Sequence, residues 1–132
     1  MRRLLVIAAA LTLSACGTAS TSKDVKFTGA QKDVADLVDK LASAGQRHDA
    51  ATICNDILAK QLLTQLKSAG GDCKTEMKDA ISDATDYDLQ VRSVKVDGDN
   101  ATAQVRQGDH GKVATFTFVK ENGGWRASAL GG

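Results

Sequence analysis

Apolar residues recur at helical spacing in the first part of the folded region. The first such set occupies positions i, i+3, i+4 and i+7, namely Val34, Leu37, Val38 and Leu41. This spacing is typical of one face of an amphipathic helix. The T-x-x-Q pattern of Thr28 and Gln31 predicts a capping box at its start, and Gly45 marks its end.

Two more helical patterns follow. Asp49 is a suitable N-cap for a second helix, whose apolar positions are Ile53, Ile57 and Leu58. A further apolar helical turn, 62–66, ends at a Gly-Gly pair. Asp72 then predicts the start of a third helix, with Met77, Ala80, Ile81 and Ala84 as its apolar positions.

From Tyr87 onward the hydrophobic period changes to two, as in a β-strand. Leu89 and Val91 alternate with polar residues, whereas Val94 and Val96 alternate in the opposite phase. This one-residue slip predicts a β-bulge at Arg92-Ser93 that bends the strand.

Three further strands are predicted between turn signals. DGDN at 97–100 is a hairpin signal, QGDHGK at 107–112 is a turn, and ENGG at 121–124 is another turn. Between them lie a strand with Val105, a strand with Phe116 and Phe118 on one face, and a last strand. That last strand is expected to place Trp125, Ala127 and Ala129 on one face. Strands joined by such tight turns pair antiparallel, as a meander.

Helices followed by a meander predict an α+β domain. We expect one domain over residues 30–132, with three N-terminal helices packed on a bent antiparallel sheet of about four strands. A bent sheet around helices has the form of a cone with a pocket at its open end. Tyr87, Trp125, Phe116 and Phe118 are the candidate pocket residues. For Trp125 a core position against the first helix is favoured, and a place at the pocket mouth is the alternative.

The N-terminus has the pattern of a secretory signal peptide. Arg2-Arg3, the apolar run LLVIAAALTL and the small pair Ser14-Ala15 occupy residues 1–15. LSAC at 13–16 resembles the bacterial lipobox, which implies that Cys16 carries lipid and becomes the first residue of the mature chain. An uncleaved helix with a chance cysteine is the alternative. The Gly-, Ser- and Thr-rich segment 16–29 is expected to be a flexible tether to a membrane on its extracytoplasmic side.

The balance of charges restricts the classes of partner that the chain is expected to bind. Lysine and arginine number 17 against 16 acidic residues, with no basic stripe, which argues against nucleic acid binding.

Besides Cys16 the chain has Cys54 and Cys73, and an exported chain meets an oxidising compartment. The pair therefore predicts a structural disulfide. A redox-active pair is the alternative, but the CxxC spacing is absent and no convergent His cluster suggests zinc.

The order of elements resembles the nuclear transport factor 2-like (cystatin-like) superfamily, in particular its small bacterial lipoproteins. The segments that carry this resemblance are LASAGQRHDAATIC, GGDC, VRSVKVDGDNATAQV and ENGGWRASAL, within residues 30–130. The resemblance implies the cone-like fold. Enzymatic relatives such as ketosteroid isomerases carry an extra hairpin between the second and third helices, and here residues 59–72 read as helix and loop.

Candidate groups for acid–base chemistry are few. They are His48, His110, Tyr87, Asp86 and Asp88. Each histidine also fits an ordinary solvated turn residue, and the two carboxylates also fit a charged helix-to-strand junction. The chain has no G-x-S-x-G, phosphate loop or metal-ligand cluster, and we predict neither catalytic residues nor a cofactor.

The sequence therefore favours a membrane-anchored, non-enzymatic binding or accessory module of the cell envelope. Its expected partners are the membrane, through Cys16, and another envelope protein or a small apolar ligand. A small isomerase- or hydrolase-like enzyme with a pocket between helices and sheet is the alternative of a different class. A purely structural envelope lipoprotein with a filled cavity is the third.

Overall fold

The computed structural model describes residues 26–84 and 86–131. The predicted signal peptide, Cys16 and the tether up to residue 25 lie outside the described residues. Within the described part, no helix combines the length and the apolar character needed to cross a membrane.

The fold is α+β, with helices first and a sheet second. The helical part consists of α1 (Gly29–Gln46), α2 (Ala50–Thr52), the π-helical segment η2 (Ile53–Ile57), α3 (Lys60–Ser68) and α4 (Cys73–Asp83). The sheet consists of β1 (Leu89–Asp97), β2 (Asn100–Gln107), β3 (Val113–Glu121) and β4 (Gly124–Leu130). All neighbouring strands are antiparallel, in the order β1-β2-β3-β4, so the predicted meander is confirmed.

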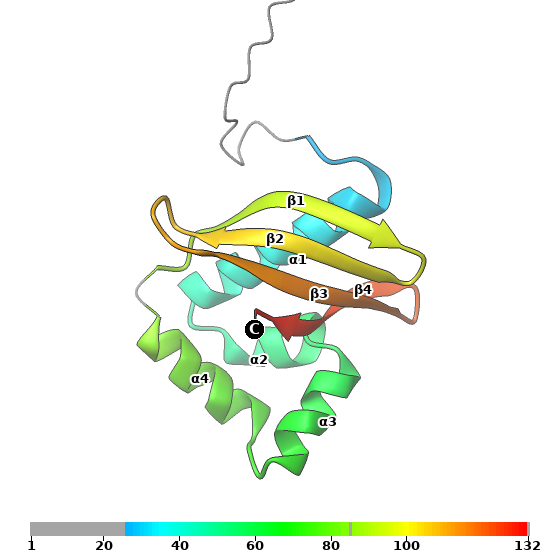
Figure 1. Cartoon of the computed structure of the whole chain (residues 1–132). Helices are drawn as coiled ribbons and strands as arrows, with labels where there is room; N and C mark the ends of the chain where they lie inside the picture. Colours follow the sequence, from blue (N-terminus) through cyan, green and yellow to red (C-terminus); the bar gives the residue numbers. More distant parts are fainter. Residues whose placement is uncertain (1–25, 85, 132) are drawn as a thin grey trace, which may run out of the picture.

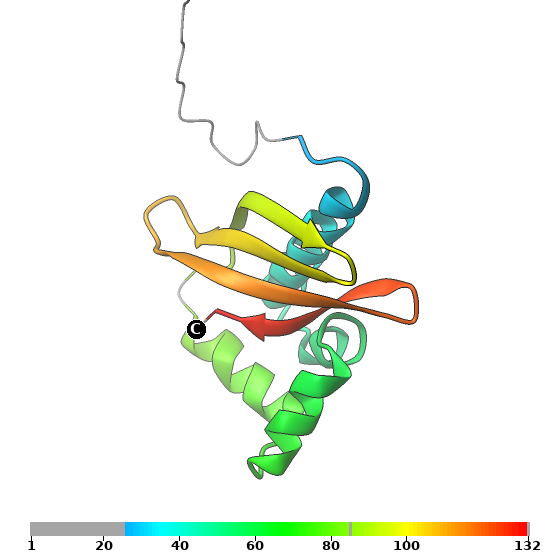
Figure 2. The same cartoon turned by 45° about the vertical axis from the view of Figure 1, so that its right-hand side comes forward.

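The helices lie on one side of the sheet and beyond one of its edges. Figure 1 shows α1 crossing behind the strands, whereas α3 and α4 form a V beyond the β4 edge. The turned view in Figure 2 shows the same arrangement. The helix-facing residues of the strands, among them Ala103, Val105 and Phe118, form one core with Val34 and Val38 of α1.

The predicted bulge in β1 is confirmed. Val91 pairs with Val105 and Ser93 pairs with Gln104, so Arg92 is the extra residue. The insertion lets both Val91 and Val94 face the core although they are three residues apart.

A second bulge, in β4, was not predicted. Phe118 pairs with Ala127 and Thr117 pairs with Ala129, so Ser128 is the extra residue. Ala129 therefore does not share a face with Trp125 and Ala127, which corrects the prediction of one continuous face. The same shift pairs Leu130 with Phe116 and turns Leu130 toward the helices.

Four helices take the place of the three predicted. Leu58 and Ala59 have extended backbones, with ψ of 140° and 149°, and they separate η2 from α3. The Ala59 amide donates to the Ala127 carbonyl at 2.8 Å, and Leu58 forms a parallel bridge with Ala127. This contact with β4 interrupts the helix at Leu58 and Ala59, although the spacing of apolar residues alone would favour a continuous helix.

Two of the three predicted caps are present. Asp49 accepts hydrogen bonds from the Thr52 hydroxyl (2.7 Å) and amide (3.0 Å), and Asp72 accepts one from the Thr75 amide. The Thr52 bonds hold the pKa of Asp49 below its usual range, so this cap is lost only as the pH falls through the lowered value. The predicted capping box is wrong: Thr28 is the N-cap, but its side chain makes no capping bond, and Gln31 instead donates to the Val94 carbonyl of β1.

The predicted disulfide joins Cys54 of η2 to Cys73 at the start of α4, with Cα atoms 6.0 Å apart. Helix α4 packs mainly on α2, η2 and α3. The bridge adds a covalent link between α4 and η2 to these contacts.

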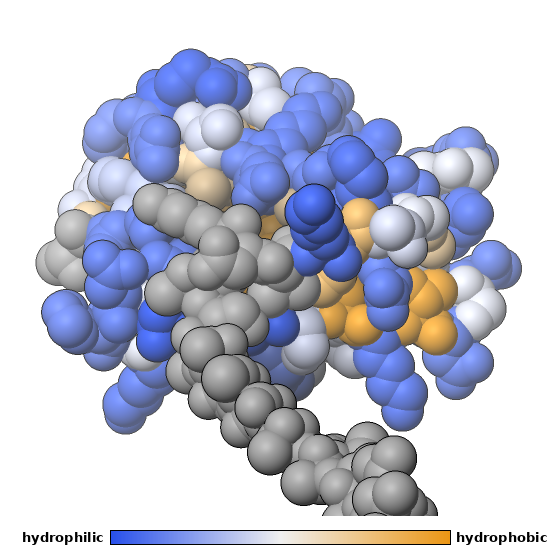
Figure 3. All heavy atoms as spheres, turned by 90° about the horizontal axis from the view of Figure 1, so that it is seen from above, coloured by the Kyte–Doolittle hydropathy of each residue, from blue (hydrophilic) through white to orange (hydrophobic). Residues whose placement is uncertain are grey.

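The large apolar side chains of the described residues are buried or half-buried, with the exception of Val113. Seen from above, polar side chains cover most of the visible face, and apolar atoms surface together near its right-hand edge (Figure 3).

Candidate binding pocket

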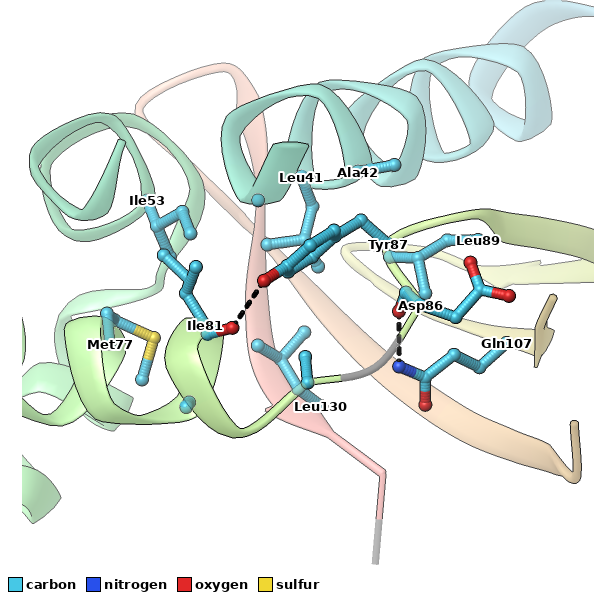
Figure 4. Close-up of a pocket in the computed structure, with 13 residues that line it drawn as sticks. Leu41, Ala42, Ile53, Met77, Ile81, Asp86, Tyr87, Leu89, Gln107 and Leu130 are labelled. Atoms are coloured by element: carbon cyan, nitrogen blue, oxygen red, sulfur yellow. Dashed lines mark hydrogen bonds between the residues drawn. The ribbon is translucent and has the colours of Figure 1, made fainter. Parts of the chain in front are cut away.

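An apolar pocket opens at the end of the sheet where β1 begins and where β2 and β4 end. Its volume is about 160 Å³. Three helical elements, the segment between α4 and β1, and three strand ends contribute its lining: Leu41, Ala42, Gly45, Ile53, Met77, Ala80, Ile81, Ala84, Asp86, Tyr87, Leu89, Gln107 and Leu130. Figure 4 shows the apolar side chains turned toward one another and Asp86 together with Gln107 at one side.

The volume is enough for one small apolar group. An engineered protein cavity of about 150 Å³ with aliphatic and aromatic walls stays dry and binds benzene. A phenyl ring or a short alkyl chain therefore matches this pocket in size and in polarity.

Tyr87 forms one wall, and its position depends on Gly45. A Cβ atom at position 45 would lie 3.1 Å from Tyr87 Cδ1, so the glycine lets the ring lie directly against α1. The phenol donates to the Ile81 carbonyl at 2.5 Å, close to the end of α4 (Figure 4). The hydroxyl is therefore satisfied within the fold, and the ring presents mainly carbon to the pocket.

The two candidate carboxylates lie beside the pocket mouth and make local hydrogen bonds. Asp86 Oδ1 accepts from the Asp88 amide at 2.9 Å, and Gln107 Nε2 donates to the Asp86 carbonyl at 2.6 Å. Asp88 Oδ2 accepts from Gln90 Nε2 at 2.9 Å. Of the two, Asp86 lines the pocket.

A buried glutamine fixes this end of the sheet. Gln90 is only 7% exposed. Besides Asp88 it donates to Asp109 at 2.8 Å, and it accepts from the Arg106 guanidinium at 3.1 Å. These bonds hold the loop after β2 against the start of β1, which positions the rim of the pocket.

The two histidines are exposed and lie outside the pocket lining. His48 has a left-handed backbone (φ 55°), and its ring meets the Tyr87 ring edge-on at 5.7 Å. His110 lines a neighbouring hollow with Asp86, Gln107, Asp109 and Gly111. Among residues 26–84 and 86–131, no group of three His, Cys, Asp or Glu side chains could hold a metal ion.

The other aromatic candidates lie elsewhere. Phe116 and Phe118 are buried in the core and do not line the apolar pocket. Trp125 is 8% exposed, belongs to the same core, and borders a hollow that Asp36 and Lys120 also line. About 16 Å of extended chain separates Trp125 from Leu130 at the pocket.

Sequence reasoning singled out Tyr87 and missed most of the wall. Leu41, Met77 and Ile81 lie on the apolar helix faces, where periodicity cannot tell a pocket wall from a core contact. The inward position of Leu130 could have been predicted from the sequence, because Leu130 is out of phase with Trp125 and Ala127. That is the same kind of slip that indicated the bulge in β1.

Comparisons with protein-family models, with curated proteins and with solved structures found no match to this chain.

Proposed function

We propose that the chain is a lipid-anchored binding module on the extracytoplasmic side of a membrane, and that its apolar pocket receives one small apolar group of a ligand. The observation that carries this proposal is the pocket of about 160 Å³ between α1, α4 and the strand ends. Its size and its aliphatic and aromatic walls suit an alkyl or aryl group. The lipobox-like LSAC sequence supports the membrane anchor.

The hydrogen bonds at the pocket favour binding over chemistry. General acid–base catalysis needs a titratable group within reach of the substrate. Tyr87 already donates to Ile81, and Asp88 does not line the pocket. Asp86 is the remaining candidate at the mouth, so an isomerase- or hydrolase-like activity would depend on that carboxylate.

Filling the pocket is expected to weaken binding. Ala42 is half-buried on α1 and lines the pocket, whereas Ala51 of α2 is exposed and does not. In the mature chain, residues 16–132 with Cys16→Ser to remove the acyl chain, benzyl alcohol should shift the amide resonances of pocket residues such as Gly45 and Ala84. Ala42→Leu should weaken this binding about tenfold or more, since the added side chain occupies the space of the ring.

Ala51→Leu adds the same atoms outside the pocket and should bind benzyl alcohol as the parent chain does. The unfolding transition of both variants shows that each is folded. Equal binding by the Ala42→Leu and parent chains, or no saturable binding by the parent chain, would remove the pocket from the proposal.

The anchor has a separate test. In the full chain, Cys16→Ala should abolish incorporation of labelled palmitate and signal-peptide cleavage at Ala15-Cys16, because the thiol that forms the thioether is gone. Ser20→Ala, outside the LSAC sequence, should leave both unchanged. A Cys16→Ala chain that is still acylated and normally processed would contradict the anchor.

A further inference from the structure

The mouth of the apolar pocket holds a carboxylate in a fixed position. Asp86 Oδ1 accepts from the Asp88 amide. Gly108 has a left-handed backbone (φ 68°), and a Cβ atom there would lie 2.2 Å from Asp86 Oδ2. The carboxylate therefore packs directly against a glycine backbone that leaves room for it, at the point where the Gly108 amide also donates to the Asp88 carbonyl at 2.7 Å.

Asp86 lies where two hollows meet. It lines the apolar pocket together with Gln107, and the same two residues line the polar hollow that also contains Asp109, His110 and Gly111. A ligand with an apolar group in the pocket would thus place its next few atoms beside Asp86.

The ionisable side chains that line this mouth include carboxylates. No lysine or arginine lines either hollow, and within residues 26–84 and 86–131 no lysine or arginine forms an ion pair with Asp86. Arg106, at this end of β2, donates to Gln90. A cationic ligand group beside Asp86 therefore meets no lysine or arginine of either lining.

We propose that the pocket selects amphipathic cations: a phenyl or short alkyl group enters the apolar pocket, and a primary ammonium group attached to it binds the Asp86 carboxylate. This inference rests on the proposed function, because it assumes that the apolar pocket is occupied. The Asp86 side chain sets the sign of charge that the ligand carries, and Gln107 holds Asp86 in place through a bond to its main-chain carbonyl (Figure 4).

Three probes that share a phenyl ring test the proposal. In the mature Cys16→Ser chain, NMR titration should give the affinity order benzylammonium, benzyl alcohol, phenylacetate. Each step is expected to be about two- to fivefold, the range of a solvent-accessible charge contact. The spread between cation and anion should shrink as salt is added, because the carboxylate is exposed to solvent.

Asp86→Asn is the matched variant. Asparagine keeps the Oδ1 acceptor for the Asp88 amide and removes only the charge, so the rim should keep its shape. The affinity for benzylammonium should fall toward that for benzyl alcohol, so that the advantage of the cation over the alcohol is lost. Asp97→Asn removes an equal charge at the far end of β1 and should leave the affinity order unchanged.

The outcomes separate this inference from the proposed function. If benzyl alcohol binds in the pocket but benzylammonium and phenylacetate bind equally well, the charge selectivity is overturned and the apolar site stands. The same conclusion follows if Asp86→Asn and Asp97→Asn reduce benzylammonium binding alike. If none of the three probes binds saturably, both the selectivity and the proposed function are overturned.

Discussion

Replacing Trp125 with alanine is expected to lower the free energy of unfolding by about 3–5 kcal/mol, the usual cost of removing a large aromatic side chain from a core. The side chain is 8% exposed and belongs to the core cluster. Its ring also lies beneath the Lys120 ammonium group, at 5.7 Å from the centroid. Urea unfolding followed by far-UV circular dichroism measures the change.

Trp125→Phe separates packing from polarity at the same position. The indole Nε1 is buried without a hydrogen-bond partner among the described residues, so phenylalanine removes an unsatisfied donor while it keeps an aromatic ring. This variant should lose much less stability than Trp125→Ala. Both should bind benzyl alcohol normally, because the apolar pocket lies at the other end of β4. Unchanged stability of Trp125→Ala with altered ligand uptake would instead identify the ring as a binding residue.

Removing the disulfide is expected to cost about 3 kcal/mol, the chain-entropy value for a loop of this length. Cys54 and Cys73 are 19 residues apart in the sequence. The double variant Cys54→Ala/Cys73→Ala should therefore melt well below the parent chain. It should also bind benzyl alcohol more weakly, because the tethered helix α4 carries Met77, Ala80 and Ile81 of the pocket wall.

A reductant gives the matched control for the bridge. Dithiothreitol should lower the melting temperature of the parent chain toward that of the double variant and should leave the double variant unchanged. Equal melting temperatures of the oxidised parent and the double variant would show that the bridge does not stabilise the domain.

The sheet could be predicted from the sequence because its signals are local. Turn sequences such as ENGG bound the strands, and the phase slip after Val91 marks the bulge at Arg92. The caps at Asp49 and Asp72 need only the following helical turn, and both are present. The two cysteines outside the LSAC sequence, Cys54 and Cys73, leave a single intramolecular pairing, which the structure contains.

The failures come from contacts between distant parts of the chain. Gln31 has the spacing of a capping box, but its amide reaches Val94, 63 residues away. The helix break at Leu58 depends on Ala127. The pocket wall combines three helical elements with three strand ends, and no local pattern specifies how these meet.

The contacts that interrupt the helix at Leu58 also protect an edge of the sheet. An unpaired edge strand is a template for association with other chains. At the β4 edge, the Ala59 amide occupies the Ala127 carbonyl and the Arg126 guanidinium is bound to the Asn55 carbonyl. At the β1 edge, Gln31 occupies the Val94 carbonyl. Both edges are thus partly closed to intermolecular strand pairing, which should limit edge-to-edge association where the local concentration of the protein is high.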